Sequence, residues 1–94
     1  MAQEVREHWR RYHQTAPAAV SPKIAKLIKA RLKEGCTRDD LLDAVDGCHA
    51  TPHNNGENDR GQKYLDLELI LRDAGHVTRY AEHYREIGKA TYGR

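Results

Sequence analysis

Apolar residues recur along the chain at a spacing of three or four positions, which places them on one face of a helix. This spacing predicts helices over residues 3–14, 22–34, 38–50 and 74–89. The expected inner faces consist of Val5, Trp9 and Tyr12; Ile24, Leu27, Ile28 and Leu32; Leu41, Leu42, Val45 and Cys48; and Val77, Tyr80, Ala81, Tyr84 and Ile87. β-Branched residues are few, so we expect an all-α protein.

Helix-capping residues mark the ends of the two central stretches. Ser21 and Pro22 combine an oxygen-bearing N-cap with a proline at the first helical position, and Gly35 suits a left-handed C-cap. Thr37, followed three residues later by Asp40, approximates a capping box. The short link between the two helices predicts an αα-hairpin, on which we expect a compact bundle of about five helices to be built.

Between the third and last helices the pattern changes. Residues 51–63 contain no hydrophobic side chain and are predicted to form a loop. Residues 66–72 are rich in leucine and isoleucine, which fits a strand, but an isolated strand would have no partner. We therefore predict a short buried helix there, followed by the last helix with Asp73 as its cap. The whole chain, residues 1–94, is expected to be one domain.

Composition limits the class of protein only broadly. The formal charge is +2, so the net charge does not by itself indicate a nucleic-acid binder. No signal peptide or apolar run long enough to span a membrane is present, and we expect a cytoplasmic protein of a bacterial host, with no membrane partner. Cys36 and Cys48 are expected to be reduced thiols that serve as small core residues.

The charge distribution is more informative than the sum. Lys23, Lys26, Lys29 and Lys33 follow one flank of the second helix, and with Arg6, Arg10 and Arg11 they form a candidate phosphate-binding surface. The alternative is an ordinary solvated helix face. Stacking on bases would require exposed aromatic residues, for which Tyr64 and Tyr92 are candidates. The other aromatic residues, Trp9, Tyr12, Tyr80 and Tyr84, are expected in the core.

Arg31 lies near the middle of the apolar face of its helix, which is unusual for a charged residue. A buried charge without a partner is very costly, so we expect a structural ion pair. The carboxylates of Asp66, Glu68 and Asp73 are the candidate partners. The alternative is an arginine that faces a binding partner.

The histidines and cysteines are the candidate metal ligands of the sequence. Cys48, His49 and His53, with Cys36 a short distance away, contain residue types that bind zinc. Pro52 ends the helix between the two histidines and no Cys-x-x-Cys pair is present, so we expect no metal site and no other cofactor.

The polar loop has two interpretations. As a recognition loop it would bind a partner through His53, Asn54, Asn55, Glu57, Asn58 and Arg60. Alternatively, its Asn, Gly and Asp residues only stabilise turns through side-chain to backbone hydrogen bonds. Catalysis is not expected, because acid–base chemistry needs a geometry that a polar loop does not guarantee. We therefore predict neither an enzyme nor a small-molecule substrate.

Four phrases occur in a characteristic order. They are I-x-x-x-I-x-x-R-L-K-E-G-x-T-x-x-D-L from Ile24 to Leu41, Gly56-Glu-Asn58 with Gly61-x-x-Tyr64, Leu67-Glu-Leu-Ile-Leu-Arg72, and Val77-x-x-Tyr80. Over residues 21–84 the chain resembles the conserved C-terminal domain of phage and prophage replication proteins, which are distantly similar to DnaD. That domain usually follows a winged helix, for which this chain has no room, so we expect either a separated domain or a small free-standing protein.

The resemblance implies a phage-type DNA replication accessory domain. Such a domain would bind single-stranded or duplex DNA, replisome proteins such as a helicase or its loader, or both, without catalysis. A second hypothesis is a stand-alone interaction module or inhibitor of a host protein. It would use the polar loop and the acidic face of the third helix, which carries Asp39, Asp43 and Asp46.

Overall fold

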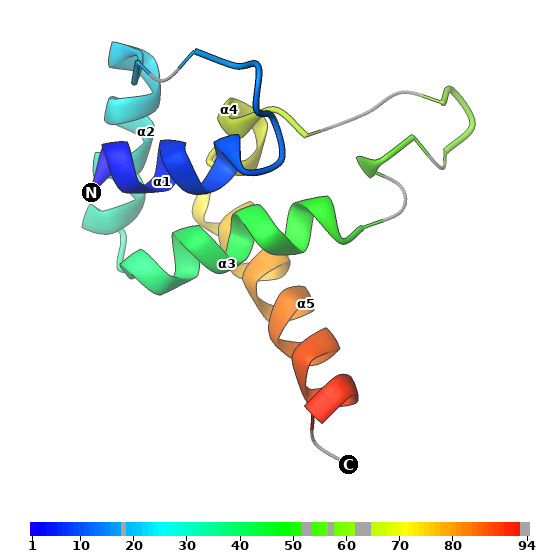
Figure 1. The fold of residues 1–94 in the computed structure, drawn as a ribbon. Helices are drawn as coiled ribbons and strands as arrows, with labels where there is room; N and C mark the ends of the chain where they lie inside the picture. Colours follow the sequence, from blue (N-terminus) through cyan, green and yellow to red (C-terminus); the bar gives the residue numbers. More distant parts are fainter. Residues whose placement is uncertain (18, 52–53, 57, 62–64, 93–94) are drawn as a thin grey trace.

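The computed structural model describes residues 1–17, 19–51, 54–56, 58–61 and 65–92, with side chains up to residue 88. The described residues form five helices: α1 (Ala2–Arg10), α2 (Pro22–Lys33), α3 (Arg38–His49), α4 (Leu67–Ile70) and α5 (Ala74–Tyr92) (Figure 1). The predicted all-α class is confirmed. The predicted bounds of α2 and α3 are right to within one residue at each end, whereas α1 ends earlier and α5 later than expected.

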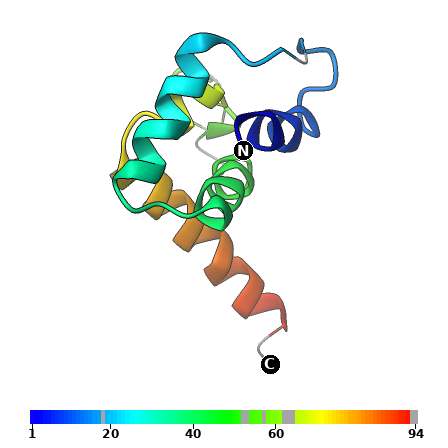
Figure 2. The same ribbon diagram turned by 90° about the vertical axis from the view of Figure 1, so that its left-hand side faces the viewer.

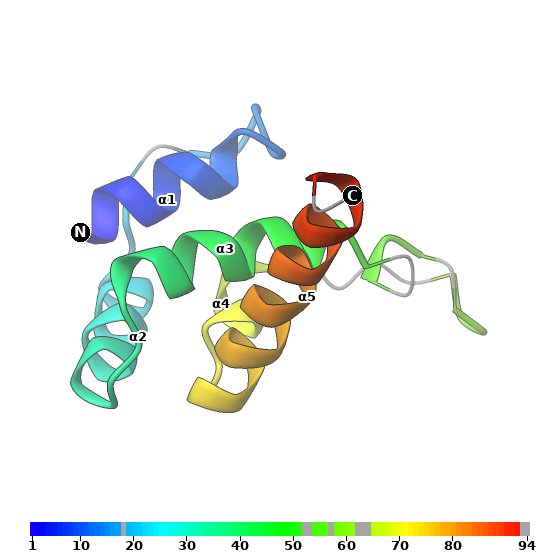
Figure 3. The same ribbon diagram turned by 90° about the horizontal axis from the view of Figure 1, so that it is seen from below.

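Helix α3 is the centre of the fold. It makes its most extensive contact with α5, and α1 packs against it from another side (Figure 3). Helix α2 runs steeply across the line of α3, and α4 lies between α2 and α3 (Figures 1 and 2). The largest packing surface is thus between α3 and α5, rather than within the predicted pair of α2 and α3.

A glycine allows α3 and α5 to approach so closely. A Cβ atom added at Gly47 of α3 would lie 1.8 Å from the carbonyl oxygen of Tyr80 in α5. The two backbones therefore touch at this point, and a side chain of any size would force them apart.

The core is built from one side of each helix. Val5, Leu41, Val45, Leu67, Ile70, Leu71 and Val77 are fully buried. The short helix α4 inserts its apolar residues between α2 and α3, with the side chain of Asp66 accepting a hydrogen bond from the backbone N–H of Glu68. The prediction of a short buried helix, in preference to a strand, is confirmed.

The predicted caps of α2 and α3 are confirmed. The Ser21 side chain accepts a hydrogen bond from the Ile24 N–H, and Gly35 has a φ of 106°. The N–H groups of Gly35 and Cys36 bind the carbonyls of Leu32 and Arg31, which is the Schellman pattern. Thr37 and Asp40 form the complete capping box. These local bonds set where α2 ends and α3 begins.

Two tyrosines predicted to lie in the core are exposed instead. Tyr12 is 47% exposed because α1 ends at Arg10 and the chain continues in turns. Tyr84 is 41% exposed and Ile87, which was expected on the inner face, is 39% exposed. The last turns of α5 project away from the other helices (Figure 1).

Candidate nucleic-acid interface

The outer face of α2 carries a row of unpaired lysines. Lys26, Lys29 and Lys33 are exposed, and no residue in the described part of the chain forms an ion pair with them. Their positions place them on one face over a length of about 10 Å, at 1.5 Å of helix rise per residue. A shallow hollow of about 570 Å³ lies beside them, lined by Pro22, Lys23, Ala25, Lys26 and Lys29.

Lys23, the first of the predicted row, differs from the other three. Its Nζ lies 2.5 Å from a carboxylate oxygen of Glu68, which joins α2 to α4. This hydrogen bond raises the pKa of Lys23 above its ordinary value. Its charge is thus largely matched within the protein, and it contributes less to an outer positive surface than its neighbours do.

The two arginines of α1 also form contacts within the protein. Arg6 donates to the carbonyl of Pro17 and lies over the Trp9 ring, with 4.6 Å from its guanidinium carbon to the ring centroid. Arg10 donates to the carbonyl of Ala16, 3.0 Å away. Both side chains therefore hold the connection between α1 and α2 in place, and Arg11 is the exposed cation of this segment.

The expected acidic face of α3 is mostly engaged within the protein. Asp43 accepts a hydrogen bond from Arg85 of α5 at 2.9 Å, and Asp40 accepts another from the same guanidinium. Asp46 contacts His8 and Tyr12 at the end of α1. Asp39 is exposed, beside Arg38. Two of the three aspartates predicted to meet a partner thus bind α1 and α5 instead.

Arg31 is buried as predicted, but its carboxylate partner is different. Its side chain donates to the carbonyls of Leu71 and Arg72, at 3.1 and 2.6 Å, and to Glu34 of its own helix at 2.8 Å. None of the predicted partners, Asp66, Glu68 and Asp73, pairs with it. The hydrogen bonds to the two carbonyls explain the burial of Arg31 better than the pair with Glu34 does. These carbonyls lie at the C-terminal end of α4, where the last carbonyls of a helix have no N–H partner within the helix.

The polar loop folds back on the end of α3. Asn54 is buried and its amide nitrogen donates to the Cys48 carbonyl, while the amide of Asn55 donates to the carbonyls of His49 and Thr51. Asn58 accepts a hydrogen bond from the Arg60 N–H, and the side chain of Arg60 is exposed. These contacts match the interpretation in which the loop stabilises itself. The predicted partner-binding residues His53 and Glu57 lie outside the described residues, as does Tyr64, and so do the side chains of Lys89 and Tyr92.

Neither Cys36 nor Cys48 forms a disulfide, and both contribute to the core or pack against it. Burial raises the pKa of Cys48 to about 12, and burial is also the main reason that the pKa of Cys36 is raised. Over the described residues, His, Cys, Asp and Glu side chains form no group of three that could hold a metal ion. Cys48 therefore behaves as a small apolar residue, as predicted.

A cluster of aromatic and histidine side chains joins the segment after α1 to the end of α3, and no spacing in the sequence indicated it. The Nε2 atoms of His13 and His49 lie 2.8 Å apart, and Tyr12 and Trp9 stack on His49 and His13 respectively. The other ring nitrogen of His49, Nδ1, lies 2.7 Å from the Val45 carbonyl and must donate to it. His49 therefore carries its proton on Nδ1 when neutral, and its Nε2 accepts from His13.

This arrangement makes stability depend on pH. Burial, more than any other cause, lowers the pKa of His49 below its ordinary 6.5. As the pH falls, the unfolded chain protonates His49 at a higher pH than the folded protein does. The stability that depends on neutral His49 is therefore fully present above pH 6.5 and is lost progressively below it. In urea titrations between pH 7 and 5, we expect the decline to be shallower for His49→Gln. The exposed control His83→Gln should keep the decline of the unchanged protein. Equal declines in all three proteins would contradict the role of His49.

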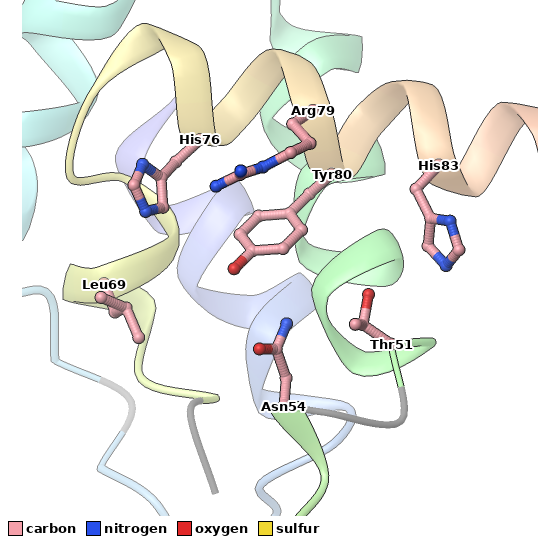
Figure 4. A pocket seen from close by; sticks show the side chains of 7 residues that line it. All are labelled: Thr51, Asn54, Leu69, His76, Arg79, Tyr80 and His83. Carbon is pink, nitrogen blue, oxygen red and sulfur yellow. The ribbon is translucent and has the colours of Figure 1, made fainter. Parts of the chain in front are cut away.

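A second hollow lies where the end of α3 and the loop meet α4 and α5. It encloses about 520 Å³ and is lined by Thr51, Asn54, Leu69, His76, Arg79, Tyr80 and His83. In Figure 4, Tyr80 projects into its centre, between the two histidines, and Asn54 lies across from its hydroxyl. The sequence showed no motif for this site, because its lining comes from segments far apart in the chain.

Comparisons with known proteins leave the identity open. The chain matches no protein-family model, and neither curated proteins nor solved structures give a significant match. The resemblance to phage replication proteins thus remains a prediction based on the sequence phrases. None of the helices in the described residues is both long and apolar enough to cross a membrane.

Proposed function

We propose that this protein binds nucleic acid through the outer face of α2, without catalysing a reaction, and that Lys26, Lys29 and Lys33 contact the phosphates. The observation that carries the proposal is that these three lysines stand on one exposed face with no acidic partner among the described residues. By contrast, Lys23 and Arg85 are matched by carboxylates. An association with phage-type replication, and a replisome partner, follow from the sequence resemblance alone and belong to the same proposal.

The placement of the two central helices supports α2 as the contact helix. In a helix-turn-helix protein the second helix enters the major groove. Here the corresponding helix would be α3, which packs against α1 and α5 and carries aspartates on its outer side. Helix α3 is therefore unsuited to DNA, whereas the lysines of α2 can bind phosphates without reading bases.

The inhibitor hypothesis has less support from the geometry. It requires Asp39, Asp43 and Asp46 to present a continuous negative surface to a host protein. Asp43 and Asp46 are instead bound by Arg85 and His8. These two carboxylates are therefore engaged within the folded protein and do not form a continuous negative surface with Asp39.

Removing the lysine charges tests the proposal. We expect the variant Lys26→Gln/Lys29→Gln/Lys33→Gln to lose most of its affinity for labelled oligonucleotides at 50 mM salt, since the phosphates would no longer be neutralised. Gln has nearly the same helix propensity as Lys, so the fold should be retained. Fluorescence anisotropy measures the affinity, and circular dichroism checks the fold.

The control for this experiment is Arg11→Gln. Arg11 was part of the phosphate-binding surface expected from the sequence, but it is an exposed cation that follows α1, and the proposed interface on α2 does not include it. Its affinity should stay within about twofold of the unchanged protein, as for a charge that makes no phosphate contact. The proposal fails if the triple variant binds as well as the unchanged protein, or if Arg11→Gln loses as much affinity as the triple variant.

A further inference from the structure

The hollow beside Tyr80 has the size and lining of a small-molecule site. Its volume of about 520 Å³ lies within the range of roughly 300–1,000 Å³ that is usual for ligand pockets. Its walls are mainly apolar, with Leu69 and the Tyr80 ring, and a few polar groups converge on it (Figure 4). None of the described lining residues is acidic, and three of them have nitrogen-bearing basic side chains: His76, Arg79 and His83. An anionic ligand is therefore favoured.

The side chain of Asn54 presents a hydrogen-bond acceptor at the wall of the hollow. Asn54 is only 5% exposed, and its amide nitrogen is engaged by the carbonyl and the Sγ of Cys48. No described residue donates to its amide oxygen, which Figure 4 shows on the side of the hollow that faces Leu69 and the Tyr80 hydroxyl. A ligand with an N–H group at this position could donate to this oxygen.

The Arg79 guanidinium lies on the side of the Tyr80 ring away from Asn54, and the two histidines flank the ring (Figure 4). The guanidinium carbon of Arg79 is 5.8 Å from the ring centroid, and Arg79 forms no ion pair with any residue in the described part of the chain. His76 is held by Asp73 through Nδ1, which leaves its Nε2 as the remaining polar atom of the ring. His83 is exposed, one helical turn after Arg79. An anion placed here would meet a planar, bidentate donor and an imidazole.

We propose that this hollow binds a nucleoside monophosphate whose base carries an exocyclic amino group. The base stacks on the Tyr80 ring, and its amino group donates to the amide oxygen of Asn54. The phosphate is held by Arg79 and His83, with charge-assisted hydrogen bonds. This site is separate from the lysine face of α2 and does not depend on it.

Calorimetric titration with adenosine monophosphate tests the proposal. We expect saturable binding, and weaker binding of both adenosine, which lacks the phosphate, and ribose 5-phosphate, which lacks the base. Absence of binding at millimolar nucleotide would overturn the proposal. So would ribose 5-phosphate binding as tightly as the nucleotide, because the hollow would then recognise only an anion.

Substitutions in the lining test whether the nucleotide binds in this hollow. Arg79→Gln should weaken adenosine monophosphate binding by at least about tenfold, as expected for a lost hydrogen bond to a charged group, while adenosine binding changes little. His83→Gln should act in the same direction, and both side chains are exposed, so the fold should be retained. The control Arg11→Gln should leave nucleotide binding unchanged. An equal loss in Arg11→Gln, or none in Arg79→Gln, would contradict the site.

The two proposals can fail separately. The triple lysine variant of α2 should bind adenosine monophosphate as tightly as the unchanged protein does, even if it no longer binds oligonucleotides. If that variant loses the nucleotide as well, the mononucleotide was held by the lysines and the hollow is not its site.

Discussion

Gly47→Ala is expected to destabilise the protein more than any other single methyl group added to a helix. The new Cβ would lie 1.8 Å from the Tyr80 carbonyl oxygen and 2.7 Å from its carbonyl carbon. Both are backbone atoms, so no change of rotamer relieves the contact and α5 must move away from α3. Since this is the largest helix–helix contact in the described residues, we expect a loss of about 3 kcal/mol or more, at the upper end of overpacking effects.

Gly88→Ala is the matched control for this prediction. Gly88 is also a helical glycine, but a Cβ there would meet nothing within 4 Å. Removing the glycine should stabilise α5 by up to about 1 kcal/mol through helix propensity alone. Urea denaturation of both variants measures the difference. Equal and small effects would mean that α3 and α5 do not touch at Gly47.

Arg31→Met is the second substitution with a large expected effect. Methionine can fill much of the space, but it leaves the carbonyls of Leu71 and Arg72 without their donor. An unsatisfied buried acceptor costs about 1–3 kcal/mol, so we expect a loss of roughly 2–3 kcal/mol. The loss is limited because the Nε of Arg31 is itself buried without a partner and is removed as well.

Glu34→Gln separates the ion pair of Arg31 from its contacts with the carbonyls. The Glu34 side chain is 44% exposed, so its pairing with Arg31 is screened by water. We expect a change below about 1 kcal/mol, in the range of exposed ion pairs. Chemical denaturation measures both variants. If Glu34→Gln destabilised the protein as much as Arg31→Met, the ion pair would be the main contribution and our account of Arg31 would be wrong.

Features that depend on neighbours in the sequence could be predicted. Ser21, Pro22 and Gly35 set the bounds of α2 through bonds that span three to five residues. The row formed by Lys26, Lys29 and Lys33 is likewise a consequence of helical period alone, because a face opposite to the apolar residues must point to solvent. For this reason the candidate interface was visible in the sequence.

Features that depend on distant partners could not be predicted. The acidic side of α3 was expected to face solvent, yet Arg85, 42 residues after Asp43, binds it. No spacing rule connects the two positions. The early end of α1 similarly depends on where the following chain turns back, since Arg10 donates to the Ala16 carbonyl.

The acceptors of Arg31 and the hollow beside Tyr80 could not be predicted from the sequence either. The apolar neighbours of Arg31 correctly indicated burial, but its acceptors are mainly backbone carbonyls, which every residue carries and no sequence pattern distinguishes. The hollow joins Asn54 of the loop to Arg79 and His83 of α5. Its lining is brought together only when α5 packs on α3.

The salt dependence of oligonucleotide binding shows whether the lysines of α2 neutralise phosphates. Contacts from Lys26, Lys29 and Lys33 to duplex phosphates predict a slope of log affinity against log salt of about −2.7, or about −2.1 for a single strand. The triple glutamine variant should show a slope near zero with whatever weak binding remains. Absence of binding by the unchanged protein at low salt, or a slope that the three substitutions leave unchanged, would contradict a nucleic-acid interface on α2.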